Sequence, residues 1–148
     1  DMGSSSICAK IVDWDESLPN KYVVVFSRYE GRLLLSRHKD RDTWETQGGH
    51  IEPGESPEDA ARRELWEESG AEDFTLEPVC MYWAEDRVDG KPESGAWGAI
   101  FFADIKTLGP MPESEMAEAR GFDALPENVT YPYITPHIFG RVRDRFKG

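Results

Sequence analysis

The feature that most constrains the fold is a stretch, residues 57–69, whose two ends both carry helix-capping residues. Ser56 is a preferred N-cap residue, Pro57 suits the first helical position, and Asp59 places an acidic side chain three residues after the cap. Gly70 supplies the matching stop, because glycine readily adopts the left-handed conformation at a helix end. The sequence therefore predicts one helix over residues 57–69, of about three and a half turns.

Strands are predicted on the N-terminal side of this helix. Residues 22–27 and 32–37 are aliphatic or β-branched runs separated by a Gly-containing bend at residues 29–31, which indicates a hairpin of two well-buried strands. A polar loop then leads to residues 44–47, which we expect to form a short extended segment that stops at Gly48 and Gly49.

A second pair of strands is predicted on the C-terminal side. Residues 78–88 and 96–105 flank the dipeptide Asp89-Gly90, which is typical of a tight hairpin turn. Residues 111–123 are expected to form a loop with some helical character. A last helix is expected to begin with Thr135 as cap and Pro136 as first residue, with an apolar stripe of Ile138, Phe139, Val142 and Phe146. The order of elements favours the α/β class, a mixed sheet covered by helices on its faces.

The length of 148 residues suits one domain with a single core, which we place at residues 7–148. Residues 1–6 are small and polar, so we set them aside as a tag or a disordered end. No apolar run approaches the roughly 18 residues that a membrane-spanning helix needs. Cys8 and Cys80 form neither a disulfide framework nor a zinc-binding spacing, so we expect a protein of the reducing cytoplasm.

Acidic residues dominate the charge of the chain, whose formal net charge is −12. This charge opposes binding to nucleic acid polymers and to anionic membranes, because such contacts depend on Lys and Arg. The segment 45–72 alone carries nine Asp or Glu side chains against two Arg, a density that favours divalent cations. A small anionic substrate is compatible with this chain if cations accompany it. We expect a monomer or a homodimer.

Three glutamates share one face of the predicted helix. Glu64, Glu67 and Glu68 fall within an arc of about 100°, while Ala61 and Leu65 lie on the adjoining face. Like charges at this spacing cost a few tenths of a kcal/mol each, a cost that a bound cation relieves. Mg²⁺ and similar ions bind through a few carboxylates together with substrate phosphates. Taken alone, however, such a cluster is more often a solvated acidic face.

The spacing around these glutamates resembles a known motif. From Gly49 to Ala71 the sequence matches the Nudix box, G-x5-E-x7-R-E-U-x-E-E-x-G-U, in which U is an aliphatic residue. The resemblance is densest over residues 44–71 and extends more loosely to residues 33–37 and 122–128. There are two departures: Ala71 is smaller than the usual aliphatic residue, and Gln47 stands where many members have proline.

The resemblance to the Nudix hydrolases implies an α/β/α sandwich and Mg²⁺- or Mn²⁺-dependent cleavage of a nucleoside diphosphate linked to another group. By the same resemblance, the metal ligands would be Glu64, Glu67 and Glu68, helped by a backbone carbonyl at Gly48 or Gly49. Arg63 would pair with a carboxylate of the motif and orient it. Glu55 would support the loop or the metal site.

Several further roles stay open at this level. The base that takes a proton from water could be Glu67 or Glu68, or a carboxylate of a later loop, where Glu115 is preferred over Glu118. Phosphate or substrate contacts are expected from four side chains, which could equally be ordinary loop or strand residues: Arg28, Arg37, Gln47 and His50. Aromatic side chains of the later hairpin could stack on a base, although core packing is more common for such residues: Tyr82, Trp83 and Trp97.

The leading interpretation is hydrolysis of a nucleoside triphosphate, including oxidised forms, to a monophosphate and pyrophosphate. A nucleotide sugar, ADP-ribose or a dinucleotide polyphosphate is the alternative substrate class. A third interpretation is a Nudix-fold sensor that binds a nucleotide without turnover, but such a module has no need of all three glutamates.

Overall fold

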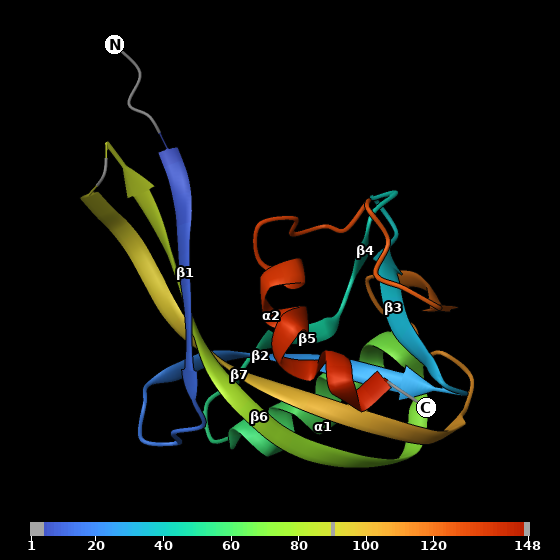
Figure 1. Cartoon of the computed structure of the whole chain (residues 1–148). Helices are drawn as coiled ribbons and strands as arrows, with labels where there is room; N and C mark the ends of the chain where they lie inside the picture. Colours follow the sequence, from blue (N-terminus) through green and yellow to red (C-terminus); the bar gives the residue numbers. More distant parts are fainter. Residues whose placement is uncertain (1–4, 90, 147–148) are drawn as a thin grey trace.

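The computed structural model describes residues 5–89 and 91–146, in which an eight-stranded sheet carries one helix on each face (Figure 1). The main strand order is β1-β6-β7-β2-β3-β4, while β5 pairs with β2 and β8 pairs with β3. The elements are β1 (Ser5–Asp13), β2 (Asn20–Tyr29), β3 (Arg32–His38), β4 (Trp44–Glu45), β5 (Gln47–His50), α1 (Pro57–Ser69), β6 (Ala71–Val88), β7 (Lys91–Leu108), β8 (Met116–Phe122), α2 (Thr135–Val142) and the 3-10 helix η1 (Arg143–Phe146). The predicted α/β class is confirmed.

Helix α1 begins and ends where its capping residues predict. The Ser56 hydroxyl accepts a hydrogen bond from the Asp59 amide at 3.1 Å, and Pro57 opens the helix. Gly70 adopts the left-handed conformation with φ of 84° and donates its amide to the Trp66 carbonyl. The helix therefore has a fixed start and a fixed end, which sets the angular positions of its glutamates.

The two helices pack on opposite faces of the central strands β2 and β7 (Figure 1). Alternate residues of β2 supply both cores, since Val23 and Val25 face α1 whereas Phe26 faces α2. The α1 side contains Ala61 and Leu65. Strands β1, β6 and β7 extend together beyond the helices (Figure 1). This sandwich leaves strand β5 beside α1 on one face and near the start of α2 on the other.

Both predicted hairpins are present, and their strands are longer than predicted. Strands β2 and β3 form the first antiparallel pair, and β2 also pairs in parallel with β7. Strands β6 and β7 form the second antiparallel pair, whose register runs from Ala71 opposite Leu108 to Val88 opposite Lys91. The turn expected at Asp89-Gly90 includes Gly90, which lies outside the described residues. Tyr82 is fully buried, as the core interpretation of the aromatic side chains predicts.

Two predicted boundaries are wrong because pairing with distant strands determines them. The extended segment does not stop at Gly48 and Gly49, since both belong to β5 and pair with Val24 and Val23 of β2. Residues 111–123 are not a loop with helical character, because they include β8, which pairs with β3. Its alternating charged residues resemble a polar loop when no partner strand is visible.

The two chain ends also differ from expectation. Residues 5 and 6, which were set aside with the N-terminus, belong to β1 and pair with β6. Helix α2 begins at Thr135 rather than after it, and Ile134 occupies the N-cap position without a side-chain hydrogen bond. Ile138 and Val142 are buried against the sheet, as the apolar stripe predicts. Within the described part of the chain, no helix has the length and apolarity required to cross a membrane.

Candidate active site

An acidic cavity of about 420 Å³ lies beside the C-terminal half of α1. Helix α1 contributes three carboxylates to its lining, and the segment before β8 contributes more. The side chain of Trp66 borders the same cavity and is 48% exposed. The lining residues are Glu64, Trp66, Glu67, Glu68, Pro112, Glu113, Ser114 and Glu115. The structure thus brings the three glutamates of the motif together with Glu115.

Strand β5 passes very close to two of these glutamates. The Gly48 amide donates a hydrogen bond to Oε1 of Glu68 at 2.8 Å. A Cβ atom at Gly49 would lie 2.7 Å from the carboxyl carbon of Glu64, and one at Gly48 would lie 2.3 Å from the Val23 carbonyl oxygen. Any side chain at either position would therefore displace a glutamate or a strand, which explains why two glycines are needed here.

Arg63 is the centre of the ion pairs around the cavity. Its Nε and Nη2 atoms donate to the two carboxylate oxygens of Glu55 at 2.7 and 2.8 Å, a bidentate arrangement. Nη1 donates to Oε1 of Glu64 at 2.6 Å, and Nη2 also reaches the His50 carbonyl at 3.1 Å. This single guanidinium therefore ties α1 to the end of β5 and to the loop that carries Glu55.

The carboxylates differ in their acidity because their surroundings differ. Burial raises the pKa of Glu68 to about 8, with further increases from the negative charges of Glu64, Glu45 and Glu115, while the hydrogen bond from Gly48 opposes the shift. Burial also raises the pKa of Glu64, although Arg63 opposes it. By contrast, the hydrogen bonds from Arg63 lower the pKa of Glu55 to about 2. Burial therefore disfavours the ionised forms of Glu64 and Glu68, and a bound cation would favour those ionised forms.

We expect proton release when Mg²⁺ binds below pH 8. As a metal ligand Glu68 would have to be a carboxylate, whereas its raised pKa of about 8 favours the protonated form at neutral pH. Mg²⁺ affinity should therefore rise between pH 6 and 8, and calorimetry in buffers of different ionisation enthalpy should detect the released proton. Without metal, the folded protein should lose stability as the pH rises from 4.5 towards 8, because the unfolded chain releases this proton first. Mg²⁺ affinity that stays constant from pH 6 to 9 would contradict this assignment.

The cavity suits a hard divalent ion by the chemistry of its donors. Carboxylate oxygens are the ligands that Mg²⁺ and Mn²⁺ prefer, and buried neighbouring carboxylates gain most from a cation between them. Across residues 5–89 and 91–146, however, no three acidic, His or Cys side chains already converge as a metal site. Arg63 occupies one oxygen of Glu64, and Gly48 occupies one of Glu68. The remaining oxygens are the ones that would hold the ion.

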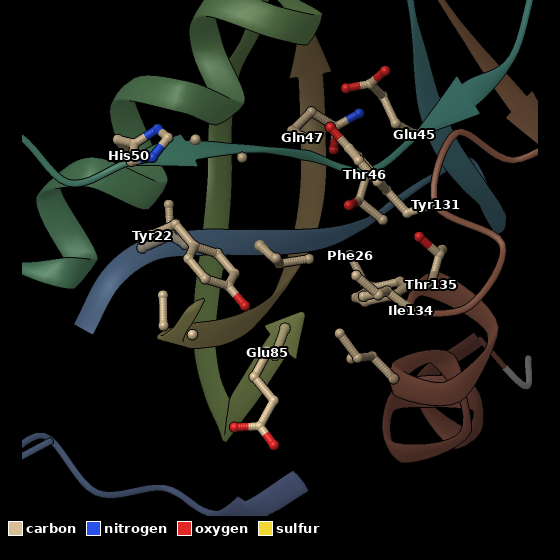
Figure 2. Close-up of a pocket in the computed structure, with 18 of the residues that line it drawn as sticks. Tyr22, Phe26, Glu45, Thr46, Gln47, His50, Glu85, Tyr131, Ile134 and Thr135 are labelled. Atoms are coloured by element: carbon tan, nitrogen blue, oxygen red, sulfur yellow. The ribbon is translucent and has the colours of Figure 1, made fainter. Parts of the chain in front are cut away.

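A second cavity, of about 490 Å³, lies on the other side of strand β5, between β2 and the start of α2 (Figure 2). Its walls combine apolar and aromatic groups with two carboxylates. Its lining includes Tyr22, Phe26, Glu85, Tyr131 and Thr135. Gly48 and Gly49 also line this cavity, and on the other side of β5 they lie against Glu68 and Glu64 of the acidic cavity.

The four expected substrate-contact residues lie in different places. Arg28 forms an ion pair with Asp104 at 3.5 Å and donates to the Arg145 carbonyl, and Arg37 binds Glu118 at 3.2 Å. Neither arginine lines either cavity. His50 is exposed at the rim of the second cavity. Gln47 also borders that cavity, but Figure 2 shows its side chain on the opposite side of β5 from Phe26, and it is fully buried.

The later carboxylates are separated by their strand positions. Glu115 precedes β8, and its exposed side chain lies at the acidic cavity, with Oε2 3.7 Å from Nε2 of His38. Glu118 lies within β8 and pairs instead with Arg37 and Arg120. Of these two candidates for the base, Glu115 is the one that borders the site.

Sequence reasoning missed most of the second cavity. Tyr22 and Phe26 appear in the sequence only as core-type strand residues, and Tyr131 and Thr135 only as residues near a helix start. Glu45, which is buried and accepts a hydrogen bond from Thr130 at 3.0 Å, appears in the sequence only as one acidic residue of a short extended segment. Only the folded arrangement of β2, β5 and α2 brings these residues together.

Comparison with known proteins identifies the family of this chain. A sequence model of the NUDIX domain matches residues 18–134. The chain therefore belongs to the Nudix family.

Individual relatives refine the comparison. A Bacillus subtilis (strain 168) protein named as 8-oxo-dGTP diphosphatase YtkD is 39% identical over 113 residues, which cover 74% of this chain and 66% of that protein. An RNA pyrophosphohydrolase of Aeromonas hydrophila is 32% identical, with 53% of this chain and 45% of that protein covered. This chain thus spans less than two thirds of both proteins. The crystal structure of the Bacillus subtilis pyrophosphohydrolase BsRppH superposes with a TM-score of 0.75 at 30% identity, covering 93% of this chain and 90% of that one.

Proposed function

We propose that this chain is a single-domain, Mg²⁺-dependent pyrophosphohydrolase that converts a nucleoside triphosphate, including oxidised forms, to a monophosphate and pyrophosphate. The observation that carries the proposal is the pair of cavities on the two sides of strand β5. One is acidic and suits a metal-bound polyphosphate. The other is partly aromatic and has the volume of a small-molecule site.

The second cavity has groups suited to a base and its ribose. Tyr22 and Tyr131 offer aromatic surface, and base stacking on aromatic side chains contributes about 1–3 kcal/mol per base. Phe26 also lines the cavity, but it is fully buried in the core behind it. Glu85 and Thr135 add polar groups at the wall. The Glu85 carboxylate accepts a hydrogen bond from Trp83 at 3.0 Å, and a carboxylate can accept further hydrogen bonds from ring N–H and amino groups, which favours a base with donors.

The chemistry is attack of water on phosphorus, which forms one P–O bond and breaks the anhydride P–O bond so that pyrophosphate leaves. A bound divalent ion would neutralise phosphate charge and acidify water, and Glu64, Glu67 and Glu68 would hold it. Arg63 keeps Glu64 in place through its short hydrogen bond. Glu115, exposed at the cavity, would take the proton from water, with Glu67 and Glu68 as the other candidates.

A second substrate candidate is the 5′-triphosphate end of RNA, which the names of the RNA pyrophosphohydrolase relatives favour. The test is phosphate and pyrophosphate release with Mg²⁺ across nucleoside triphosphates, 8-oxo-dGTP, ADP-ribose, a nucleotide sugar, a dinucleotide polyphosphate and a 5′-triphosphorylated oligonucleotide. Faster turnover of the free triphosphates supports the proposal, whereas faster turnover of the oligonucleotide favours the second candidate. Binding without turnover of any compound would instead indicate a sensor.

Tyr131→Ala should weaken substrate binding without slowing the chemical step. Tyr131 borders the second cavity, so its loss should raise KM roughly tenfold, in line with the stacking energy of one base, while kcat stays within about twofold. Steady-state kinetics on the best nucleotide measures both constants. Tyr133→Ala is the matched control, because Tyr133 is 76% exposed and borders neither cavity. Equal effects of the two substitutions would argue against base binding in this cavity.

A further inference from the structure

A chain of buried hydrogen bonds runs from the middle of the sheet to helix α1. Ser27 Oγ donates to Gln47 Oε1 at 2.6 Å, and Gln47 Nε2 donates to Ser36 Oγ at 3.0 Å. Ser36 Oγ then donates to the backbone carbonyl of Glu68 at 2.7 Å. Ser27, Ser36 and Gln47 have no exposed surface. Three side chains from three strands thus end on a residue of the acidic cavity.

The direction of this chain follows from the number of protons available. Gln47 Nε2 has two hydrogens, and its acceptors are Ser36 Oγ and the Leu34 carbonyl at 3.2 Å. Ser36 Oγ therefore accepts a hydrogen bond from Gln47, and its own hydroxyl group donates to the Glu68 carbonyl. The Leu34 carbonyl can only accept, which fixes the orientation of the amide with Nε2 beside it, and Ser27 Oγ then donates to Oε1. No donor of the Gln47 side chain is left for a substrate.

The Glu68 carbonyl needs this partner because it lies in the last turn of α1. The final four carbonyls of a helix have no amide partner within the helix. Ser36 satisfies the carbonyl of Glu68, while the Gly48 amide holds its carboxylate at 2.8 Å. The backbone carbonyl of Glu68 is therefore bound to β3, and its side-chain carboxylate is bound to β5.

We propose that Gln47 and Ser36 are positioning residues, which fix the end of α1 and thereby set the place of the Glu68 carboxylate in the acidic cavity. This replaces the expectation that Gln47 contacts substrate. It also gives a physical reason for the glutamine that precedes the two glycines, because a proline there has no side-chain donor for Ser36. The inference rests on the proposed function only in taking Glu68 as a metal ligand.

The test compares Ser36→Ala with Ser27→Ala in the metal-free protein. Both substitutions remove a buried hydroxyl of the same chain, so both should lower the melting temperature by a few degrees. Ser36→Ala alone frees the end of α1 from β3. The amide proton of Gly48, followed by NMR, should move upfield and exchange faster with solvent in Ser36→Ala, and should stay as in the parent protein in Ser27→Ala.

Metal titration provides the second readout. Mg²⁺ affinity should fall about tenfold in Ser36→Ala, as for other groups that orient ligands, and should change less than twofold in Ser27→Ala. Gln47→Leu removes the donor that orients the Ser36 hydroxyl but keeps the hydroxyl itself, so Mg²⁺ affinity should fall in the same direction as in Ser36→Ala and by a smaller factor. A Gly48 signal that is unchanged in Ser36→Ala, or that shifts equally in both serine variants, would overturn the inference. If the parent protein takes up no metal, the proposed function fails, and the Gly48 signal alone still decides the inference.

Discussion

Glu67→Gln should lower kcat by roughly 100-fold or more, because losing a ligand costs at least as much as losing a group that only orients one. Glu67 borders the acidic cavity, and its side chain is 41% exposed. Glutamine keeps the shape and the helix propensity, so the fold should survive while one ligand charge is lost. Turnover at saturating Mg²⁺ and the melting temperature, measured on the same sample, separate loss of chemistry from loss of structure.

The matched control is Glu58→Gln, the same chemical change on the same helix. Glu58 is exposed in the first turn and pairs with Arg62 at 3.7 Å, a surface contact of small energetic value. Its substitution should leave kcat within about twofold. Unchanged turnover in Glu67→Gln would remove Glu67 from the ligand set.

Arg63→Lys should be the second most damaging substitution. The guanidinium bridges both oxygens of Glu55, one oxygen of Glu64 and the His50 carbonyl, and a single ammonium cannot span these acceptors. Activity should fall about 10- to 100-fold, as expected when a group that orients a metal ligand is lost. Kinetics with Mg²⁺ titration should show weaker metal binding as the main cause.

A pH-dependent melting series provides an independent check on Arg63. Arg63 lowers the pKa of Glu55 to about 2, so their pairing stabilises the parent protein above pH 4.5 and is lost as the pH falls towards 2. This part of the stability profile should flatten in Arg63→Lys. Arg62→Lys is the control, since Arg62 lies on the exposed face and pairs only loosely with Glu58. Parallel profiles for all three proteins would contradict the assignment.

Local chemistry explains why helix α1 could be predicted residue by residue. A cap, a proline and a terminal glycine act within a few residues of one another, so no distant contact is needed to define the helix. The angular positions of Glu64, Glu67 and Glu68 then follow from helix geometry alone. The same reasoning predicted the strands of both hairpins, because their turns and apolar runs are neighbours in sequence.

Strands defined by distant partners could not be predicted in this way. Strand β5 depends on pairing with β2, and β8 depends on pairing with β3. The role of Gln47 depends on both of these neighbours, because its partners Ser27, Leu34 and Ser36 come from β2 and β3. Because its hydrogen-bond partners lie on other strands, Gln47 resembles, in the sequence alone, an ordinary polar residue beside a loop.

The two glycines of β5 have a consequence for how substrates are selected. Gly48 and Gly49 line the second cavity on one side of β5 and lie against Glu68 and Glu64 on the other, so the strand carries no side chain between the two cavities at these positions. A molecule that occupies both must therefore turn around this narrow edge. For a nucleotide bound as proposed, the number of bonds between the ring and the scissile phosphorus would therefore matter alongside the identity of the ring.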